Sequence, residues 1–308
     1  MDDRVEPHHA RPRPMNMVHL PEAHAAAPSH IRQTDAAAHR TRREFDRLHR
    51  GVYADPAVTL SATDRIRAAH LSAGPAAVVA GLSAHFLHGT RYPDISGDVE
   101  VIRDLRGQGR RRTGVTIIRT DRLGADDIVD ISGMPVTSVV RTAYDLGRRR
   151  PDWLALGHLD DLARCSGLDL SQLWAYTRDH DRARGICQLR ELVGLVDPLS
   201  ESPGESWTRL IMHRHQLPRP ESQIEVFDDS GALIARFDLG YRRYKIGIDY
   251  DGVDYHSSEE QKLHDLRRDG AVRQRGWIPL RTNAAALSSD EVGEMARIER
   301  ALELRGHR

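Results

Sequence analysis

Two aspartates in the C-terminal third of the sequence have the spacing that a divalent metal site needs. Asp238 and Asp249 lie in the segment RFDLGYRRYKIGIDYDG, which alternates around a turn expected at Arg242-Arg243. In such a hairpin we expect Asp238 opposite Gly247 and diagonal to Asp249, and same-face diagonal Cβ atoms lie about 7–8 Å apart. Magnesium typically takes one or two protein carboxylates and keeps several waters. The spacing therefore predicts a Mg²⁺ (or Mn²⁺) site that binds a phosphodiester.

The alternative is that these aspartates simply occupy solvated strand ends. Both, however, interrupt an apolar alternation, and an isolated carboxylate beside a core is costly. Asp251 is two residues beyond Asp249 and hence on the same strand face, although Asp251-Gly252 is also a turn signature. Glu205 is the third residue of a helix that Ser202 would cap, so a capping box explains it as well as metal chemistry does.

Two basic side chains follow the second aspartate. His256 supplies an imidazole, a group that ordinarily titrates near neutral pH and could deprotonate a water, although a lone histidine is often structural. Lys262 is expected on the next helix, where it could stabilise charge on a cleaved phosphate or occupy a solvated face. The candidate catalytic set is Glu205, Asp238, Asp249, Asp251, His256 and Lys262.

The motifs around these residues resemble a known group of nucleases. SESPGES, LPRPESQ, ARFDLGY, IDYDGVDYHS and the spread Gln261-x-x-x-Asp265-x-x-Arg268 before GWIPLR are similar to bacterial Vsr-like endonuclease-domain proteins of the PD-(D/E)XK class, over residues 200–308. The resemblance implies metal ligands at Asp238 and Asp249, with Glu205 matching the early helical glutamate. His256 matches a histidine that acts near the scissile phosphate in the very-short-patch-repair enzymes, which cut DNA beside a mismatch.

This chain departs from the family pattern at two points. Asp249 replaces a glutamate, and no lysine stands two residues after it. The resemblance implies a Mg²⁺-dependent DNA endonuclease or nicking enzyme. The two departures favour the alternative, a non-catalytic, antitoxin-type DNA-binding regulator with a degenerate nuclease fold.

The preceding region carries a looser resemblance. HRGVY, LSAHFLHG and GMPVTSVVRTAYDLGRR resemble the AbiEi-type antitoxin region, which we expect over residues 41–196. In that family a winged-helix unit precedes the antitoxin region, and a vestigial helix of it is expected at residues 41–49. The helical spacing of Phe45, Leu48 and Val52 supports a helix over residues 41–53.

The elements that would position these residues form an α/β (α+β) chain. Upstream we expect helices at 76–88, 136–146 and 153–165 and strands at 99–102 and 115–118. After a linker at 197–203, helix 205–215, strands 223–227, 233–239 and 244–250, helix 259–275, strand 278–280 and helix 290–304 give a restriction-endonuclease-like αβββαβα domain with a mixed sheet. Residues 1–40 lack apolar periodicity and are expected to be disordered.

Composition limits the remaining choices. The 308 residues favour two domains, and 45 basic residues balance 45 acidic ones, so phosphate binding would depend on local patches. No apolar run is long enough to cross a bilayer, and two cysteines, Cys165 and Cys187, fit a reducing cytoplasm. DNA is the expected partner, no membrane association is expected, and a homodimer or a toxin-type protein partner stays open.

Overall fold

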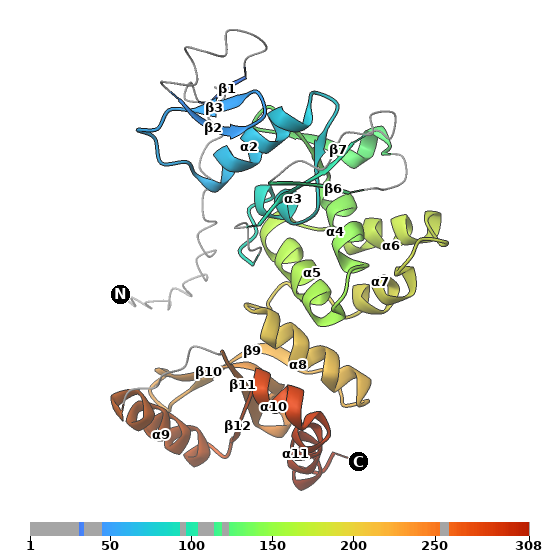
Figure 1. Cartoon of the computed structure of the whole chain (residues 1–308). Coiled ribbons are helices and arrows are strands. Elements are labelled where there is room, and N and C mark those ends of the chain that lie inside the picture. The colour runs from blue at the N-terminus through green and yellow to red at the C-terminus, as the bar shows by residue number, and fades with distance from the viewer. Residues whose placement is uncertain are drawn as a thin grey trace, which may run out of the picture.

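A computed structural model describes residues 31–33, 45–92, 97–103, 114–118, 123–252 and 259–307 as helices packed on three sheets (Figure 1). The α+β class expected from the sequence is confirmed. Within the described ranges, no helix has the length and apolar character needed to cross a membrane.

The first sheet contradicts the helix expected at residues 41–53. It has the order β1-β3-β2, with strands β1 (Ile31–Gln33), β2 (Asp46–His49) and β3 (Val52–Ala54). All three residues of β3 are buried because this strand is paired on both sides, and Gly51 turns the chain at φ 78°. The vestigial helix expected at 41–49 is therefore wrong over residues 46–49, and residues 41–44 lie outside the described residues.

A five-stranded sheet follows the helix α2 (Ala62–Ala73), in the order β6-β5-β4-β8-β7. Its strands are β4 (Val78–Val79), β5 (Val99–Ile102), β6 (Val115–Ile118), β7 (Ile128–Ile131) and β8 (Met134–Thr137). The strands expected at 99–102 and 115–118 are confirmed. The helices expected at 76–88 and 136–146 each begin with a strand instead, because short apolar runs pair centrally as β4 and β8 before α3 (Gly81–Leu87) and α4 (Val139–Gly147) start.

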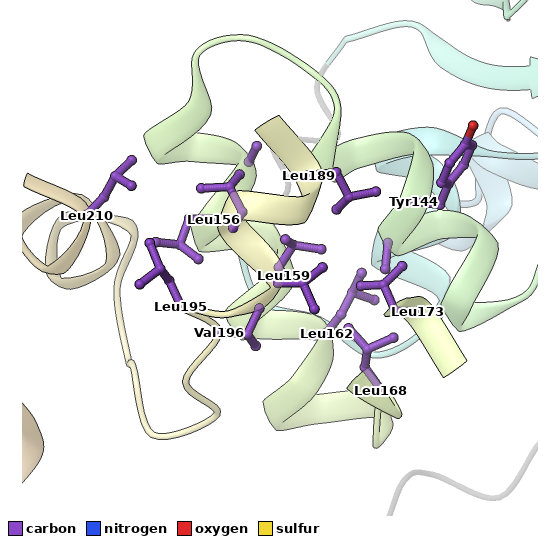
Figure 2. Close-up of a cluster of buried hydrophobic side chains, with 14 of the residues drawn as sticks. Tyr144, Leu156, Leu159, Leu162, Leu168, Leu173, Leu189, Leu195, Val196 and Leu210 are labelled. Carbon is purple, nitrogen blue, oxygen red and sulfur yellow. The ribbon is translucent and has the colours of Figure 1, made fainter. Parts of the chain in front are cut away.

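Four helices form the middle layer, and their core is drawn in Figure 2. They are α4, α5 (Asp152–Ser166), α6 (Leu170–Asp179) and α7 (Ile186–Val193). Leu156, Leu159 and Leu162 of α5 are fully buried against Leu189 of α7, which confirms the helix expected at 153–165. Leu210, from the following helix, joins this same core.

The C-terminal part has the expected αβββαβα order with two short helices added, Arg242–Tyr244 between the second and third strands and α10 before the last helix. Its elements are α8 (Pro203–Arg214), β9 (Glu221–Phe227), β10 (Leu233–Tyr241), β11 (Ile246–Asp251), α9 (Glu259–Gln274), β12 (Ile278–Asn283), α10 (Ala284–Ser289) and α11 (Glu291–Leu304). The sheet order is β12-β11-β10-β9, and β11 and β12 are parallel, so the sheet is mixed as expected. One apolar core joins it to α8, α10 and α11, and a second joins it to α9.

Helix α8 is common to the two parts of the chain. It lies between α4–α7 and the C-terminal sheet (Figure 1), and it supplies Leu210 to the upstream core and Met212 to the downstream one. The rings of Trp153 and Trp207 stack across the α5–α8 contact at 5.1 Å. The domain boundary expected at 197–203 stays a prediction, and Ser200 within that segment is fully buried.

Candidate active site

The β10–β11 register differs from the one that the sequence suggested. Gly247 pairs with Gly240, so the expectation that Asp238 stands opposite Gly247 is wrong. The turn is longer than assumed, because the short helix Arg242–Tyr244 and the left-handed Lys245 (φ 51°) separate the strands. The backbone ladder between β10 and β11 ends at Leu239 and Ile248, so Asp238 and Asp249 are the residues just beyond its last pair. The two carboxyl groups are close enough for the charge of Asp238 to raise the pKa of Asp249.

The side chain of Asp238 is held by the neighbouring strand. The backbone N–H of Tyr250 donates to Asp238 Oδ2 at 2.8 Å. This bond continues the contact between β10 and β11 through a side chain, beyond the last backbone pair of the ladder. It fixes one carboxylate oxygen of Asp238 and directs the group toward β11.

Glu205 is brought to the same place by the first turn of α8. Ser202 caps the helix by accepting the N–H of Glu205, but the Glu205 carboxylate accepts the N–H of Glu201 at 2.9 Å rather than completing a capping box with Ser202. Gly204 lets this turn lie directly on β11, since a Cβ there would overlap the ring of Tyr250. The carboxylate is therefore available for a role other than capping.

Burial raises the pKa values of all three carboxyl groups. Burial, with the Asp238 charge adding to it, raises the pKa of Glu205 to about 7. Burial also raises the pKa of Asp249 to about 6, against the opposing effect of Arg268, and raises that of Asp238. A carboxylic acid that titrates near neutrality suits proton transfer, and such groups gather at functional sites.

The raised pKa of Glu205 predicts a pH-dependent cost of folding. A group whose pKa is raised on folding stabilises the native state below its ordinary pKa, and this contribution is lost as the pH rises through 7. In EDTA, Glu205→Gln should therefore match the wild type near pH 4 and exceed its free energy of unfolding at pH 8 by about 3 kcal/mol. Urea unfolding at the two pH values measures the difference.

The hydrogen bonds of Glu205 make glutamine a suitable replacement for this measurement. Glu201 N–H and Gln223 Nε2 both donate to the same oxygen, Oε2, so the amide oxygen of a glutamine can accept both bonds. Equal stability of the two proteins at both pH values would show that Glu205 does not carry a buried charge.

Of the other predicted site residues, Asp251 is described by the structure, and it does not join Glu205, Asp238 and Asp249. Asp251 lies at the end of β11 with an oxygen 4.0 Å from Arg281 Nη1, and Arg281 also pairs with Asp265 and Asp269 on α9. Asp251 thus belongs to a neighbouring ionic network. His256 and the side chain of Lys262 lie outside the described residues, and their roles stay predictions.

Two residues of the site were not predicted from the sequence. Gln223 donates from Nε2 to Glu205 at 3.1 Å, and its Oε1 is buried without a hydrogen-bond partner among the described atoms. Its φ of 52°, left-handed within β9, is strained for a non-glycine residue, and such strain is concentrated at functional sites. Arg268 of α9 donates to Asp249 Oδ2 at 2.7 Å. Both residues lie within the motifs that resemble the nuclease family, and those motifs were the feature of the sequence that could have identified them.

The donor set suits a hard cation that keeps much of its water. In the part of the chain that the structure describes, no group of three His, Cys, Asp or Glu side chains forms a ready metal-ligand set. Magnesium needs only one or two protein carboxylates besides water and substrate oxygens. Asp238 and Asp249, with the unpartnered Gln223 oxygen nearby, offer oxygen ligands alone, and this fits Mg²⁺ or Mn²⁺.

Comparisons with known proteins give relatives but no assigned activity. No protein-family model matches the chain. The uncharacterized proteins MT2308 and Rv2248 of Mycobacterium tuberculosis, from strains CDC 1551 / Oshkosh and ATCC 25618 / H37Rv, are each 30% identical to it over 170 residues. The match covers 54% of this chain and 61% of each relative, so the chain spans less than two thirds of their length.

Among solved structures, the crystal structure of the RV2827C protein from Mycobacterium tuberculosis is similar at 17% identity and a TM-score of 0.37, covering 61% of this chain and 75% of that one. A likeness this low adds nothing to the description of the fold.

Proposed function

We propose that this chain is a divalent-cation-dependent DNA endonuclease or nicking enzyme that hydrolyses phosphodiester bonds. The observation that carries the proposal is the group formed by Glu205 and Asp249, which are buried, and Asp238, which is half-buried; we call it the carboxylate cluster. Within the described ranges its one direct cationic partner is Arg268, so the ionised cluster has two more negative charges than positive ones. Buried charge without compensation is costly, and a divalent cation would offset it.

The surroundings of each residue suggest its role in the proposed reaction. Asp238 and Asp249 would hold the cation, which when bound supplies Lewis-acid activation of the phosphate and of a water. Glu205 has a pKa of about 7 and would accept a proton from that water. Gln223 orients Glu205 by donating to its Oε2. His256 and Lys262 stay candidates for proton transfer and phosphate contact at this site.

DNA as the substrate is proposed from the resemblance of residues 200–308 to Vsr-like endonuclease domains. The looser resemblance of residues 41–196 to the AbiEi-type antitoxin region belongs to this proposal as well. A cytoplasmic location, a homodimer and a toxin-type protein partner belong to the same proposal.

Purified protein is expected to nick supercoiled plasmid DNA with Mg²⁺ or Mn²⁺ and to lose this activity in EDTA. The carboxylate cluster repels a phosphate unless a cation lies between them. Conversion of supercoiled to open-circular plasmid on a gel measures the rate, and re-addition of metal should restore it. Undiminished nicking in EDTA would contradict a metal site.

A second function, a non-catalytic antitoxin-type DNA-binding regulator, is favoured by two observations. Arg268 occupies Asp249 Oδ2, and the position where the family has a lysine holds Asp251, which faces Arg281. A regulator would retain DNA in a gel-shift assay and leave plasmid intact with every cation tried. If the wild-type protein binds DNA but cleaves no plasmid with any cation, the second proposal replaces the first.

A further inference from the structure

Arg268 is held in a defined position beside the carboxylate cluster. Its guanidinium lies 5.1 Å from the centre of the Phe237 ring while Nη2 donates to Asp249 Oδ2 at 2.7 Å. Phe237 is fully buried, stacks on Trp277 at 5.8 Å and covers Gly247, where a Cβ would overlap its ring. The Phe237 ring and the Asp249 carboxylate thus hold the guanidinium of Arg268 in place.

The guanidinium also retains the capacity to bind a second anion. An arginine has five N–H donors, and the bond to Asp249 uses one of them. The Arg268 side chain is 18% exposed, so part of it is accessible to solvent. Planar guanidinium groups bind phosphate oxygens in pairs, which makes a DNA phosphate a strong competitor for the contact with Asp249.

A cation and Arg268 compete for the same carboxylate. Asp249 is 8% exposed, and its ionic partner in the described structure is Arg268. A metal ion that approaches Asp249 meets both a partly neutralised ligand and a positive charge within a few ångströms. Without DNA, the ion pair therefore weakens metal binding.

We propose that Arg268 couples metal binding to DNA binding by exchanging Asp249 for a DNA phosphate. In the DNA-free protein it pairs with Asp249 and lowers the affinity for the cation. When DNA is bound, a backbone phosphate takes the guanidinium and leaves Asp249 to the metal. This inference rests on the proposed function, and it assigns to Arg268 a positioning role that limits metal loading to the DNA complex.

Linkage gives the proposal a measurable form. If DNA raises the affinity for the cation, the cation must raise the affinity for DNA by the same factor. Some coupling arises in any site where a metal contacts a phosphate, so the diagnostic quantity is the share that disappears without Arg268. Removing the guanidinium should strengthen metal binding in the DNA-free protein and reduce the further gain that DNA gives.

The experiment measures Mn²⁺ binding to the full chain by the electron paramagnetic resonance signal of free Mn²⁺, with and without a duplex oligonucleotide at one salt concentration. Arg268→Gln should bind Mn²⁺ about tenfold more tightly than the wild type without DNA, which corresponds to about 1.4 kcal/mol. Arg268→Lys keeps the charge but loses the planar fork, so its gain should be smaller. The readout does not depend on turnover.

Arg236→Gln is the matched control for the loss of one positive charge. Arg236 acts electrostatically on Asp238 from the same strand, but its ion pair is with Glu201 at 2.8 Å, outside the metal ligands. Its Mn²⁺ affinity should stay within about twofold of the wild type, and its DNA-dependent gain should be retained.

The outcomes separate the inference from the function on which it rests. Equal DNA-free Mn²⁺ affinity in the wild type, Arg268→Gln and Arg236→Gln would overturn the role of Arg268 while leaving metal-dependent nicking in place. An equal rise in both glutamine variants would reduce the effect to net charge and overturn it too. Absence of Mn²⁺ binding in all proteins, with and without DNA, would overturn the proposed function itself.

Discussion

Asp238→Asn is expected to abolish nicking while leaving the protein folded. Asparagine has the shape of aspartate, and its amide oxygen can accept the Tyr250 N–H that Asp238 Oδ2 accepts at 2.8 Å. The variant loses the negative charge that holds the cation. Loss of an outer partner of a metal site already costs about 10–100-fold in affinity or activity, so loss of a ligand should exceed that range. The plasmid-nicking rate at saturating Mg²⁺ measures the effect.

The same variant separates catalysis from DNA binding. Without metal, a carboxylate in the site repels phosphate, so the affinity of Asp238→Asn for DNA in EDTA should equal or exceed that of the wild type. Gel-shift titrations must use one salt concentration, because affinity for DNA phosphates depends steeply on salt.

Asp229→Asn makes the same chemical change at a side chain that is 90% exposed, on the β9–β10 turn, and should leave the nicking rate unchanged. Wild-type nicking by Asp238→Asn would remove Asp238 from the site and with it the cation ligands proposed here.

The order of the C-terminal elements was predictable from the sequence, but the pairing between strands was not. Alternating apolar residues predicted β9, β10 and β11, and the helical spacings predicted α8, α9 and α11. The register depends on how many residues the turn uses, and Lys245 adopts a left-handed conformation that no local pattern announces. This is why Asp238 was expected opposite Gly247, which pairs with Gly240.

The upstream differences have a related physical origin. The spacing of Leu48 and Val52 fits a helix and a hairpin equally well over so short a stretch, and tertiary pairing decided for β2 and β3. Strands β4 and β8 are too short to show a period, and they exist because each is paired on both sides in the five-stranded sheet.

The acidic part of the site was predictable, whereas its partners were not. Asp238, Asp249 and Glu205 interrupt or begin apolar segments, and this made them visible in the sequence. Arg268 meets Asp249 only because α9 packs against β10, and Gln223 meets Glu205 only because β9 passes the first turn of α8. Such contacts arise from tertiary structure, and among many arginines the sequence does not single out the paired one.

Arg209→Met should destabilise the chain more than any surface substitution, because it leaves a buried carboxylate without its cation. Asp160 of α5 and Arg209 of α8 are 0% and 1% exposed and form an ion pair. Asp160 also accepts Ser206 Oγ at 2.5 Å and the N–H of Asp197 at 2.8 Å. Breaking a buried pair on one side costs about 3–5 kcal/mol. Urea unfolding of the metal-free protein measures this loss.

The loss should depend on pH in a defined direction. Burial raises the pKa of Asp160 and Arg209 opposes the rise, so removing Arg209 raises that pKa further. A carboxyl group with a raised folded pKa stabilises the native state when protonated, and this contribution is lost as the pH rises. The deficit of Arg209→Met should therefore be largest at pH 8 and smaller at pH 5, and Asp160→Asn in the same chain should recover part of it.

Arg214→Met provides the control on the same helix. Arg214 is 41% exposed and pairs with Asp152 and Glu191 at 3.0 Å, so its loss should cost at most about 1 kcal/mol at either pH. Because Ser206 directly follows Glu205, the Asp160 contact also sets the first turn of α8, and Arg209→Met should slow nicking at temperatures where it is still folded. Equal stability of Arg209→Met and Arg214→Met would mean that the buried pair does not hold α8 on α5. The Asp160–Arg209 contact would then not position the first turn of α8, which carries Glu205.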